Sequence, residues 1–213
     1  MKRTFLTIAC GIMLMAAQAQ VHYTLEAGYA LSANFSPSPA LRQPLNGVQI
    51  DAAIDYRFKN VPLLGIKAGV GYKFAGYYST TKHLLVYAPT VADGDMESIV
   101  DHSIFVPARL TINFDVQDWT LKLITGPKLS YHWAKTNYRA ANYIYPTGES
   151  TLSNVYLPFD CSWGIGFGAE YKHFYLEVMY DMGLFNRTRR DHGSYDMNTF
   201  SSRELSVTVG YMF

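Results

Sequence analysis

The chain is poor in cysteine and, beyond its first residues, has no long apolar run. Cysteine occurs twice in 213 residues, at Cys10 and Cys161. Cys10 lies in an N-terminal segment that we expect to be removed, so Cys161 is left without a partner for an intramolecular disulfide. A transmembrane helix needs about 20 consecutive, mostly apolar residues, and the sequence after this segment contains no such run. The sequence therefore predicts neither a disulfide framework nor a transmembrane helix.

An excess of charge of one sign is also lacking. The chain has 18 basic and 17 acidic residues, a net charge of +1. Removing the N-terminal segment takes away Lys2 and Arg3, which leaves 16 basic against 17 acidic residues and a net charge of −1. Proteins that bind nucleic acid usually have a basic surface, so we expect no nucleic-acid partner.

The N-terminal segment has the features of a secretory signal. Two basic residues precede an apolar run that ends near Ala17, and Ala17 and Ala19 suit the −3 and −1 positions of a signal peptidase site. We expect residues 1–19 to be a signal peptide, cleaved on export, and residues 20–213 to form one outer-membrane domain. Cys10 raises the alternative of a lipoprotein, but TIAC is a poor lipobox and the apolar run continues past it.

Alternation of apolar and polar residues is the dominant pattern in the rest of the chain. Aromatic residues make up 15% of the sequence, including 17 tyrosines, and many lie on the apolar side of the alternation. A period of two residues indicates β-strands, and a tilted strand crosses a bilayer in about 9–11 residues. Eight segments of this kind follow one another: 23–35, 48–59, 64–74, 103–114, 119–131, 159–171, 174–184 and 204–213.

The links between these segments are alternately long and short. Three are little more than a turn, with the sequences KNVP, DVQD and KH. The other four are Ser36–Asn46, Tyr77–Asp101, His132–Asn154 and Arg187–Ser201. Outer-membrane barrels have short periplasmic turns and longer extracellular loops. The sequence therefore predicts an all-β fold, an eight-stranded antiparallel up-and-down transmembrane β-barrel.

Alternation alone leaves open which face points outward, because a soluble barrel such as a lipocalin would turn its apolar face inward. Glycine and aromatic residues favour lipid on the apolar side. Ten of the 16 glycines fall on the polar face, where they make room for long side chains in a narrow lumen. Aromatic residues gather near both ends of the apolar face, as in interfacial girdles. They are Phe58, Phe114, Trp119, Tyr171, Phe174 and Phe213 at the short-turn end and Phe35, Phe74 and Tyr131 at the loop end.

Charged residues favour the same orientation. The apolar face carries essentially one, Arg203, near the loop end of its strand; an arginine facing mid-membrane lipid would cost about 2–4 kcal/mol, and one near the interface costs little. The polar face carries fourteen: Glu26, Asp51, Asp55, Asp160, Glu170, Glu177, Asp181, Glu204, Arg57, Lys67, Lys73, Arg109, Lys122 and Lys128. We expect a mutually neutralising network that plugs the lumen. The alternative is a polar pathway or proton relay.

Two prolines, Pro107 and Pro127, fall inside predicted strands. Each removes a hydrogen-bond donor from the ladder. We therefore expect a bulge, or a carbonyl bonded to water, beside each of them.

The segment from Ser103 to Phe213 resembles a known family. SIFVPARLTINF is similar to a family strand with an internal proline, LKLITGPKLSY to its Gly-Pro strand, and FDCSWGIGFGAEY with FYLEVMYDMGLFN to its glycine-rich hairpin. The positions that carry the resemblance are Pro107, Gly126, Pro127, Asp160, Gly164, Gly166, Gly168, Tyr180, Gly183, Leu184 and Asn186. The family is the PorT family of outer-membrane β-barrel domains, and the resemblance implies this fold without an assigned chemistry. It also implies that Phe213, an aromatic final residue, is a signature recognised by the outer-membrane assembly machinery.

We assign no catalytic, cofactor-binding or metal-binding residue. The nearest catalytic constellations are Asp101–Ser103, with the sequence DHS, and Asp191–Ser194, with the sequence DHGS. Neighbouring residues of a strand point to opposite faces, so Asp101 and His102 cannot readily form a relay, and the second group lies in a loop without a rigid frame. An acidic group that could hold calcium, but lacks the rest of an EF-hand pattern, is Asp93, Asp95 and Glu97.

The long links are rich in tyrosine and arginine, which are typical of recognition surfaces, and an outer-leaflet phosphate would also suit the arginines. These residues are Tyr77, Tyr78, Tyr87, Tyr138, Tyr143, Tyr145, Tyr156, Tyr195, Arg139, Arg187, Arg189 and Arg190. We predict a non-enzymatic protein of a Gram-negative outer membrane that contacts lipopolysaccharide and has a structural or surface-binding role through its extracellular loops. The alternatives are a lipid A-modifying enzyme and a small channel.

Overall fold

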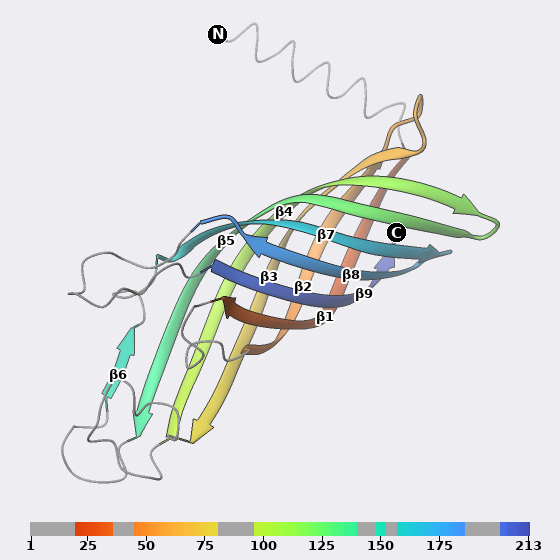
Figure 1. The fold of residues 1–213 in the computed structure, drawn as a ribbon. Helices are drawn as coiled ribbons and strands as arrows, with labels where there is room; N and C mark the ends of the chain where they lie inside the picture. The colour runs from red at the N-terminus through yellow and green to blue at the C-terminus, as the bar shows by residue number, and fades with distance from the viewer. Residues whose placement is uncertain (1–19, 36–44, 81–95, 140–147, 152–156, 186–200) are drawn as a thin grey trace, which may run out of the picture.

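Nine strands form one antiparallel sheet in the computed structural model, which describes residues 20–35, 45–80, 96–139, 148–151, 157–185 and 201–213 (Figure 1). Their bounds are β1 (Gln20–Phe35), β2 (Leu45–Arg57), β3 (Leu64–Thr80), β4 (Met96–Val116), β5 (Trp119–Arg139), β6 (Gly148–Thr151), β7 (Phe159–Tyr171), β8 (Phe174–Gly183) and β9 (Ser201–Met212). β-Branched and aromatic residues, which favour a pleated surface, occupy many outward positions of these strands. No helix within the described ranges is long and apolar enough to cross a membrane.

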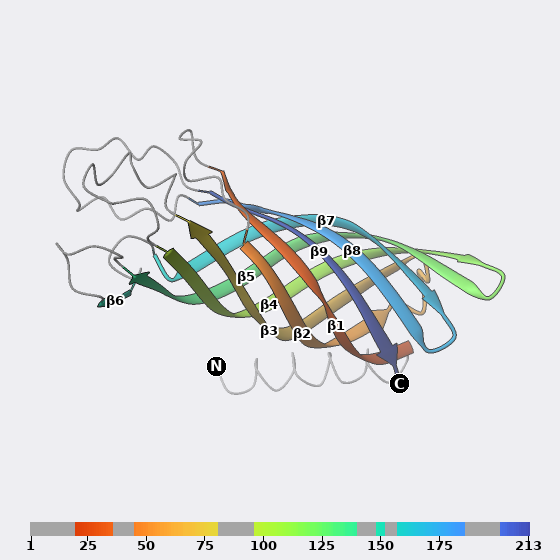
Figure 2. The same cartoon turned by 90° about the horizontal axis from the view of Figure 1, so that it is seen from below.

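Eight of these strands close into a barrel. Their order along the sheet is β4-β3-β2-β1-β9-β8-β7-β5, and β4 pairs with β5 to complete the ring. β1 pairs with β9, with Glu26 opposite Gly210, so the first and last strands of the chain lie side by side (Figure 2). The short strand β6 pairs with residues 135–138 of β5 and lies outside the ring. The predicted eight-stranded barrel is confirmed.

The turns agree with the prediction better than the long links do. β4 and β5 are joined by residues 117–118, and β7 and β8 by residues 172–173. The predicted bounds of two long links are wrong, because β3 continues to Thr80, β4 begins at Met96 and β5 continues to Arg139 (Figure 1). These extensions pair with one another beyond the point where β2 begins. Their mixed composition hides the alternation, and the ladder with the neighbouring strand fixes them instead.

The barrel wall turns apolar residues outward and polar residues inward. In β2, Gln49, Asp51 and Asp55 are buried, whereas Ile50 and Ile54 are 59% and 48% exposed. The ten glycines predicted on the polar face are all buried or half-buried. A soluble barrel would show the reverse arrangement, so the lipocalin-like alternative is wrong and the outward face suits lipid.

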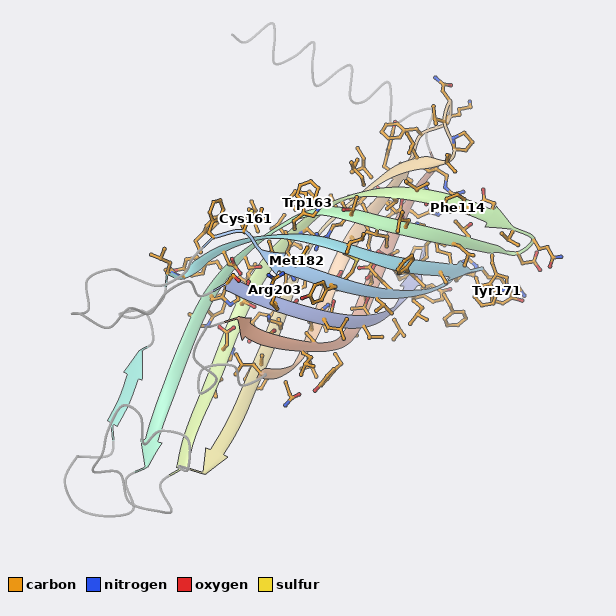
Figure 3. The ribbon with its side chains drawn as sticks, in the orientation of Figure 1. Phe114, Cys161, Trp163, Tyr171, Met182 and Arg203 are labelled. Atoms are coloured by element: carbon orange, nitrogen blue, oxygen red, sulfur yellow. The ribbon has the colours of Figure 1, made fainter. Side chains whose placement is uncertain are left out.

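Aromatic side chains mark both ends of the outward face. At the turn end the rings of Trp119 and Tyr171 lie 4.7 Å apart, and Figure 3 shows Phe114 and Tyr171 at this end and Arg203 toward the other. Phe74 and Tyr131 are exposed at the loop end, which agrees with two girdles. The predicted position of the Phe35 side chain lies outside the described side chains.

The two prolines do not produce the predicted bulges. Pairing between β4 and β5 is interrupted beside Pro107 and Pro127, but the register is the same on both sides of the interruption, so no residue is inserted. At this point Gly126 has a φ of +149°, and its carbonyl accepts a hydrogen bond from the guanidinium of Arg109. A lumen side chain therefore satisfies the carbonyl that precedes Pro127.

Candidate functional site

The fourteen charged residues predicted on the polar face all point into the barrel, where each is buried or half-buried. Twelve of them take part in ion pairs, which fall into three groups along the lumen. The other two, Asp51 and Asp160, have no basic side chain within 4.0 Å among the described residues. Burial of this many charges is tolerated only where partners and hydrogen bonds compensate the loss of water.

The first group lies near the turn end. Lys122 of β5 contacts the carboxylates of Asp55 on β2 and Glu170 on β7. Arg57 lies 3.8 Å from Glu170 and 3.2 Å from Asp115, which is exposed at the turn end of β4. This group therefore joins four strands across the end of the lumen.

The second group is centred on Lys67 of β3. Its Nζ lies 2.6 Å from both Glu26 and Glu177, on β1 and β8. The same Nζ lies 4.3 Å from the ring centroid of Tyr175, a cation–π contact. Tyr175 in turn donates a hydrogen bond to Glu177. One lysine thus compensates two carboxylates, and the group carries one negative charge in excess.

The third group lies on the loop side of the second. Lys128 of β5 contacts Asp181 and Glu204 at 2.7 Å each. Arg109 lies 2.6 Å from Asp181, and Lys73 contacts Glu204. Three bases therefore share two carboxylates, so this group carries one positive charge in excess.

Apolar residues fill the space between the ion-pair groups. Ile124, Tyr175 and Met179 form a buried cluster. Phe105 is also buried, and the centroid of its ring lies 5.7 Å from Lys128 Nζ. These inward apolar residues were not singled out by the sequence analysis, because they lie on a face that is otherwise polar. A cavity of about 30 Å³ remains beside them, which is room for about two water molecules. The described lumen is thus packed with side chains, as the predicted plug requires.

The predicted Asp101–Ser103 constellation is split by the strand. Asp101 and Ser103 are buried in the lumen, whereas His102 lies on the outward face. There the imidazole stacks on Trp133 with ring centroids 6.0 Å apart, and its Nδ1 bonds to the hydroxyl of Tyr72. Asp101 and His102 thus lie on opposite faces of the strand, as expected from their adjacent positions.

Asp101 has a different imidazole partner, which the sequence analysis missed. His132 Nδ1 lies 2.9 Å from Asp101 Oδ2, and His132 pairs directly across the strands with Ser103. The Ser103 hydroxyl is fully buried and makes no hydrogen bond to a described residue. Asp101 and His132 were predicted to lie in two different loops, Tyr77–Asp101 and His132–Asn154. Only the extended pairing of β4 with β5 brings them together.

The other predicted candidates are only partly described. Asp93, Asp95 and Asp191–Ser194 lie outside the described residues, as do the loop residues beyond the strand ends. The side chains of Glu97 and of Tyr77, Tyr78, Tyr138 and Arg139 are likewise outside the described side chains. Within the described part of the chain, no group of three histidine, cysteine or acidic residues is placed to hold a metal. Cys161 is a half-buried free thiol on β7 (Figure 3).

Several solved structures are similar to this chain. Ail, the attachment invasion locus protein of Yersinia pestis, is 14% identical with a TM-score of 0.49, and the match covers 91% of this chain and 99% of Ail. Neisserial surface protein A is 16% identical with a TM-score of 0.42, covering 90% and 97%. The outer membrane enzyme PagL is 10% identical with a TM-score of 0.44, covering 86% and 97%. Comparison with curated protein sequences finds no match.

A family comparison is more decisive than these structures. Residues 16–189 match the family described as outer membrane protein beta-barrel domain. The matched range includes the whole of β1 to β8, from Gln20 to Gly183, and it agrees with the closed barrel and its apolar outward face. The chain belongs to the outer membrane protein beta-barrel domain family.

Proposed function

We propose that this protein is an integral outer-membrane barrel that is neither an enzyme nor a channel, and that it has a structural or binding role through its extracellular segments. The packed lumen carries the proposal. Ion pairs and apolar side chains occupy the described interior from the turn end to Lys128, which supports a lumen without an open pore. The segments that remain for recognition are the long links, which are rich in tyrosine and arginine.

The topology belongs to the same proposal. Residues 1–19 are a signal peptide cleaved after Ala19, and the short turns face the periplasm. The long links then face the cell exterior among lipopolysaccharide molecules. Within the broader family, the segment from Ser103 onward is of the PorT type. Mass spectrometry of the purified protein tests the cleavage site, and protease shaving of intact cells tests which links are outside.

Two measurements test the absence of channel and enzyme activity. The refolded protein in planar bilayers should give no steady unit conductance. Intact-lipid mass spectrometry should give the same acyl pattern with and without the gene. A steady conductance or an altered acyl pattern would overturn the proposal.

A third experiment tests the role of the long links. Replacement of residues 81–95 by a glycine–serine linker of equal length should abolish a surface-binding phenotype while the barrel remains heat-modifiable on gels.

We also propose that the assembly machinery recognises the end of β9. Phe213 is 69% exposed, its N–H donates a 2.8 Å hydrogen bond to the carbonyl of Tyr23, and its ring packs against Tyr211. Phe213→Ser should reduce the amount of barrel in the outer membrane, yet the same variant should refold in detergent. Phe174→Ser is a matched control, because Phe174 is 67% exposed at the same end. Equal losses for both variants would contradict a specific role for Phe213.

A second candidate function, lipid A modification, is favoured by one observation. Asp101 holds His132, and Ser103 lies across the strands from that imidazole, which are the residue types of an acyl-transfer relay. The relay is incomplete in the structure, since Ser103 makes no hydrogen bond to His132. If the acyl pattern does depend on the gene, His132→Ala and Ser103→Ala should abolish the effect. His102→Ala should not, because His102 faces outward.

A further inference from the structure

Two polar side chains of β2 face the internal cavity without a partner. Gln49 and Asp51 are each 8% exposed and both line the cavity of about 30 Å³. In the described part of the chain, neither side chain makes a hydrogen bond or an ion pair. A buried carboxylate without a direct partner is costly, so these groups call for a ligand.

The charges around the cavity balance without Asp51. The group centred on Lys67 carries one excess negative charge, and the group of Arg109, Lys73 and Lys128 carries one excess positive charge. Asp51 adds a further negative charge, and no described basic nitrogen lies within 4.0 Å of its carboxylate. It also lies directly opposite Glu26 in the pairing of β1 with β2, where two like charges repel one another.

Glu26 has an oxygen that is free to share. Its Oε1 lies 2.6 Å from Lys67 and accepts a hydrogen bond from Thr24. Its Oε2 accepts only a long hydrogen bond, 3.3 Å, from Thr208 among the described residues. Glu26 lines the same cavity as Gln49 and Asp51. Three side chains from two adjacent strands, each with oxygen atoms at its end, therefore line one cavity.

We propose that this cavity binds a monovalent alkali-metal cation, sodium or potassium, between the carboxylates of Asp51 and Glu26 and the amide oxygen of Gln49. Oxygen ligands suit hard cations. One positive charge neutralises the excess of one negative charge, whereas a divalent ion would leave an excess positive charge beside Lys67 and Lys128. The volume admits one such ion together with about one water molecule. The site is independent of the role proposed for the extracellular segments.

The test is the dependence of stability on the cation. The mature protein, folded into lipid bilayers, is unfolded by urea at fixed pH and constant ionic strength in sodium, potassium or N-methylglucamine chloride. A ligand that binds only the folded state lowers the unfolding equilibrium constant by about tenfold for each tenfold rise in its concentration once the site is saturated. We expect this slope for sodium or potassium and none for N-methylglucamine, which is too large for the cavity. The ion with the steeper onset is the preferred one.

Asp51→Asn should abolish the slope, because the neutral amide removes the excess charge. Asp55→Asn is the matched control: it lies on the same strand and the same inward face, but its carboxylate contacts Lys122 outside the cavity. That variant should lose stability in every salt and keep the slope. An unchanged slope in Asp51→Asn, or the absence of a slope in the wild type, would overturn the proposal. A wild type that responds to pH through Asp51 and not to the cation would mean that a proton occupies the site, which also overturns it.

A second measurement does not depend on any variant. Thallium(I) scatters anomalously and substitutes for potassium, so a crystal of the wild type soaked in thallium acetate should show an anomalous peak between Asp51 and Glu26. Competition by excess sodium or potassium should remove that peak. A soaked crystal without a peak in the cavity would contradict the site even if Asp51→Asn fails to fold.

Discussion

Lys67, Lys122 and Lys128 each lie between two carboxylates inside the barrel. In a soluble protein of this size an apolar core would occupy that space. Here the apolar surface faces lipid, so charged residues span the lumen and hold strands on opposite sides together. Each lysine is therefore a cross-link whose loss leaves buried carboxylates with fewer partners.

Replacing Lys128 by Met should destabilise the barrel strongly. The change removes the contacts to Asp181 and Glu204, and breaking a buried ion pair by removing one partner costs about 3–5 kcal/mol. Asp115→Asn is the comparison, because the side chain of Asp115 is 57% exposed and pairs with Arg57; exposed pairs contribute about 0–1 kcal/mol. Urea unfolding in lipid vesicles measures both. Similar losses for the two variants would contradict a packed lumen.

Gly28 should not tolerate alanine. A methyl group at this position would lie 2.2 Å from the backbone carbonyl oxygen of Val207, and a backbone atom cannot move aside as a side chain can. Overpacking of this kind costs about 1–3 kcal/mol. At Gly210 the nearest contact of the added methyl is a side-chain carbon of Glu26 at 2.8 Å, so Gly210→Ala should cost less. The same unfolding assay ranks the two variants, and the reverse order would be inconsistent with this packing.

The sequence was sufficient to place the fourteen charges inside, since alternation depends only on neighbours along the chain. It could not pair them. Lys67 and Glu177 are 110 positions apart, and Lys128 and Glu204 are 76 apart. Which residues meet depends on how far the strands are staggered around the closed ring. His132 was missed for a related reason: its contact with Asp101 follows from the pairing of β4 and β5 outside their predicted bounds, which began at Ser103 and ended at Tyr131.

Strand ends and turns set the shape of this barrel at the next scale. β3, β4 and β5 continue past the other strands, and β6 joins them by pairing with β5 (Figure 1). Composition alone did not indicate these extensions, because their side chains alternate poorly and the ladder of the neighbouring strand supports them. The turns are the opposite case. KH and DVQD marked their positions correctly, although Lys172 and Gln117 both adopt a φ of 55°.

Lys172→Gly should stabilise the β7–β8 turn. A residue other than glycine in the left-handed region costs about 1–2 kcal/mol, and glycine removes this cost but adds flexibility to the unfolded chain, about 0.5–1 kcal/mol. The expected net gain is a few tenths to about 1 kcal/mol. Lys59→Gly, in the exposed β2–β3 connection and without a positive φ, should bring only the loss. A higher urea midpoint for Lys59→Gly than for Lys172→Gly would refute this explanation.

The whole molecule is oriented by its outward surface. An apolar band lies between the two aromatic girdles. β7 crosses it from Phe159 at the loop end to Tyr171, which Figure 3 shows at the turn end. Ile165 lies midway along this strand and is 49% exposed, whereas Phe159 is 54% exposed at its edge. Similar exposure at two depths offers a direct test of the membrane position.

Arginine at the two positions should therefore have different effects. Ile165→Arg places a charge near the bilayer midplane, which costs about 2–4 kcal/mol, while Phe159→Arg near the interface costs about 0–1 kcal/mol. Folding into vesicles, followed by urea titration, measures the difference. In detergent micelles, where water reaches the charge more easily, the two variants should differ less. Equal costs in vesicles would mean that the bilayer does not surround β7 in this way.

The seam between β1 and β9 sets an order in time. The Thr208 hydroxyl donates a hydrogen bond to Glu26, 182 positions earlier in the chain, and contacts between such distant residues form slowly. If the chain is exported as proposed, β1 arrives before β9, and until β9 arrives β1 has an unpaired edge on which foreign strands could dock. On that route the edge needs shielding until the barrel closes, so we expect a shortage of periplasmic chaperone to lower the yield of this protein more than a defect in its final folding step does.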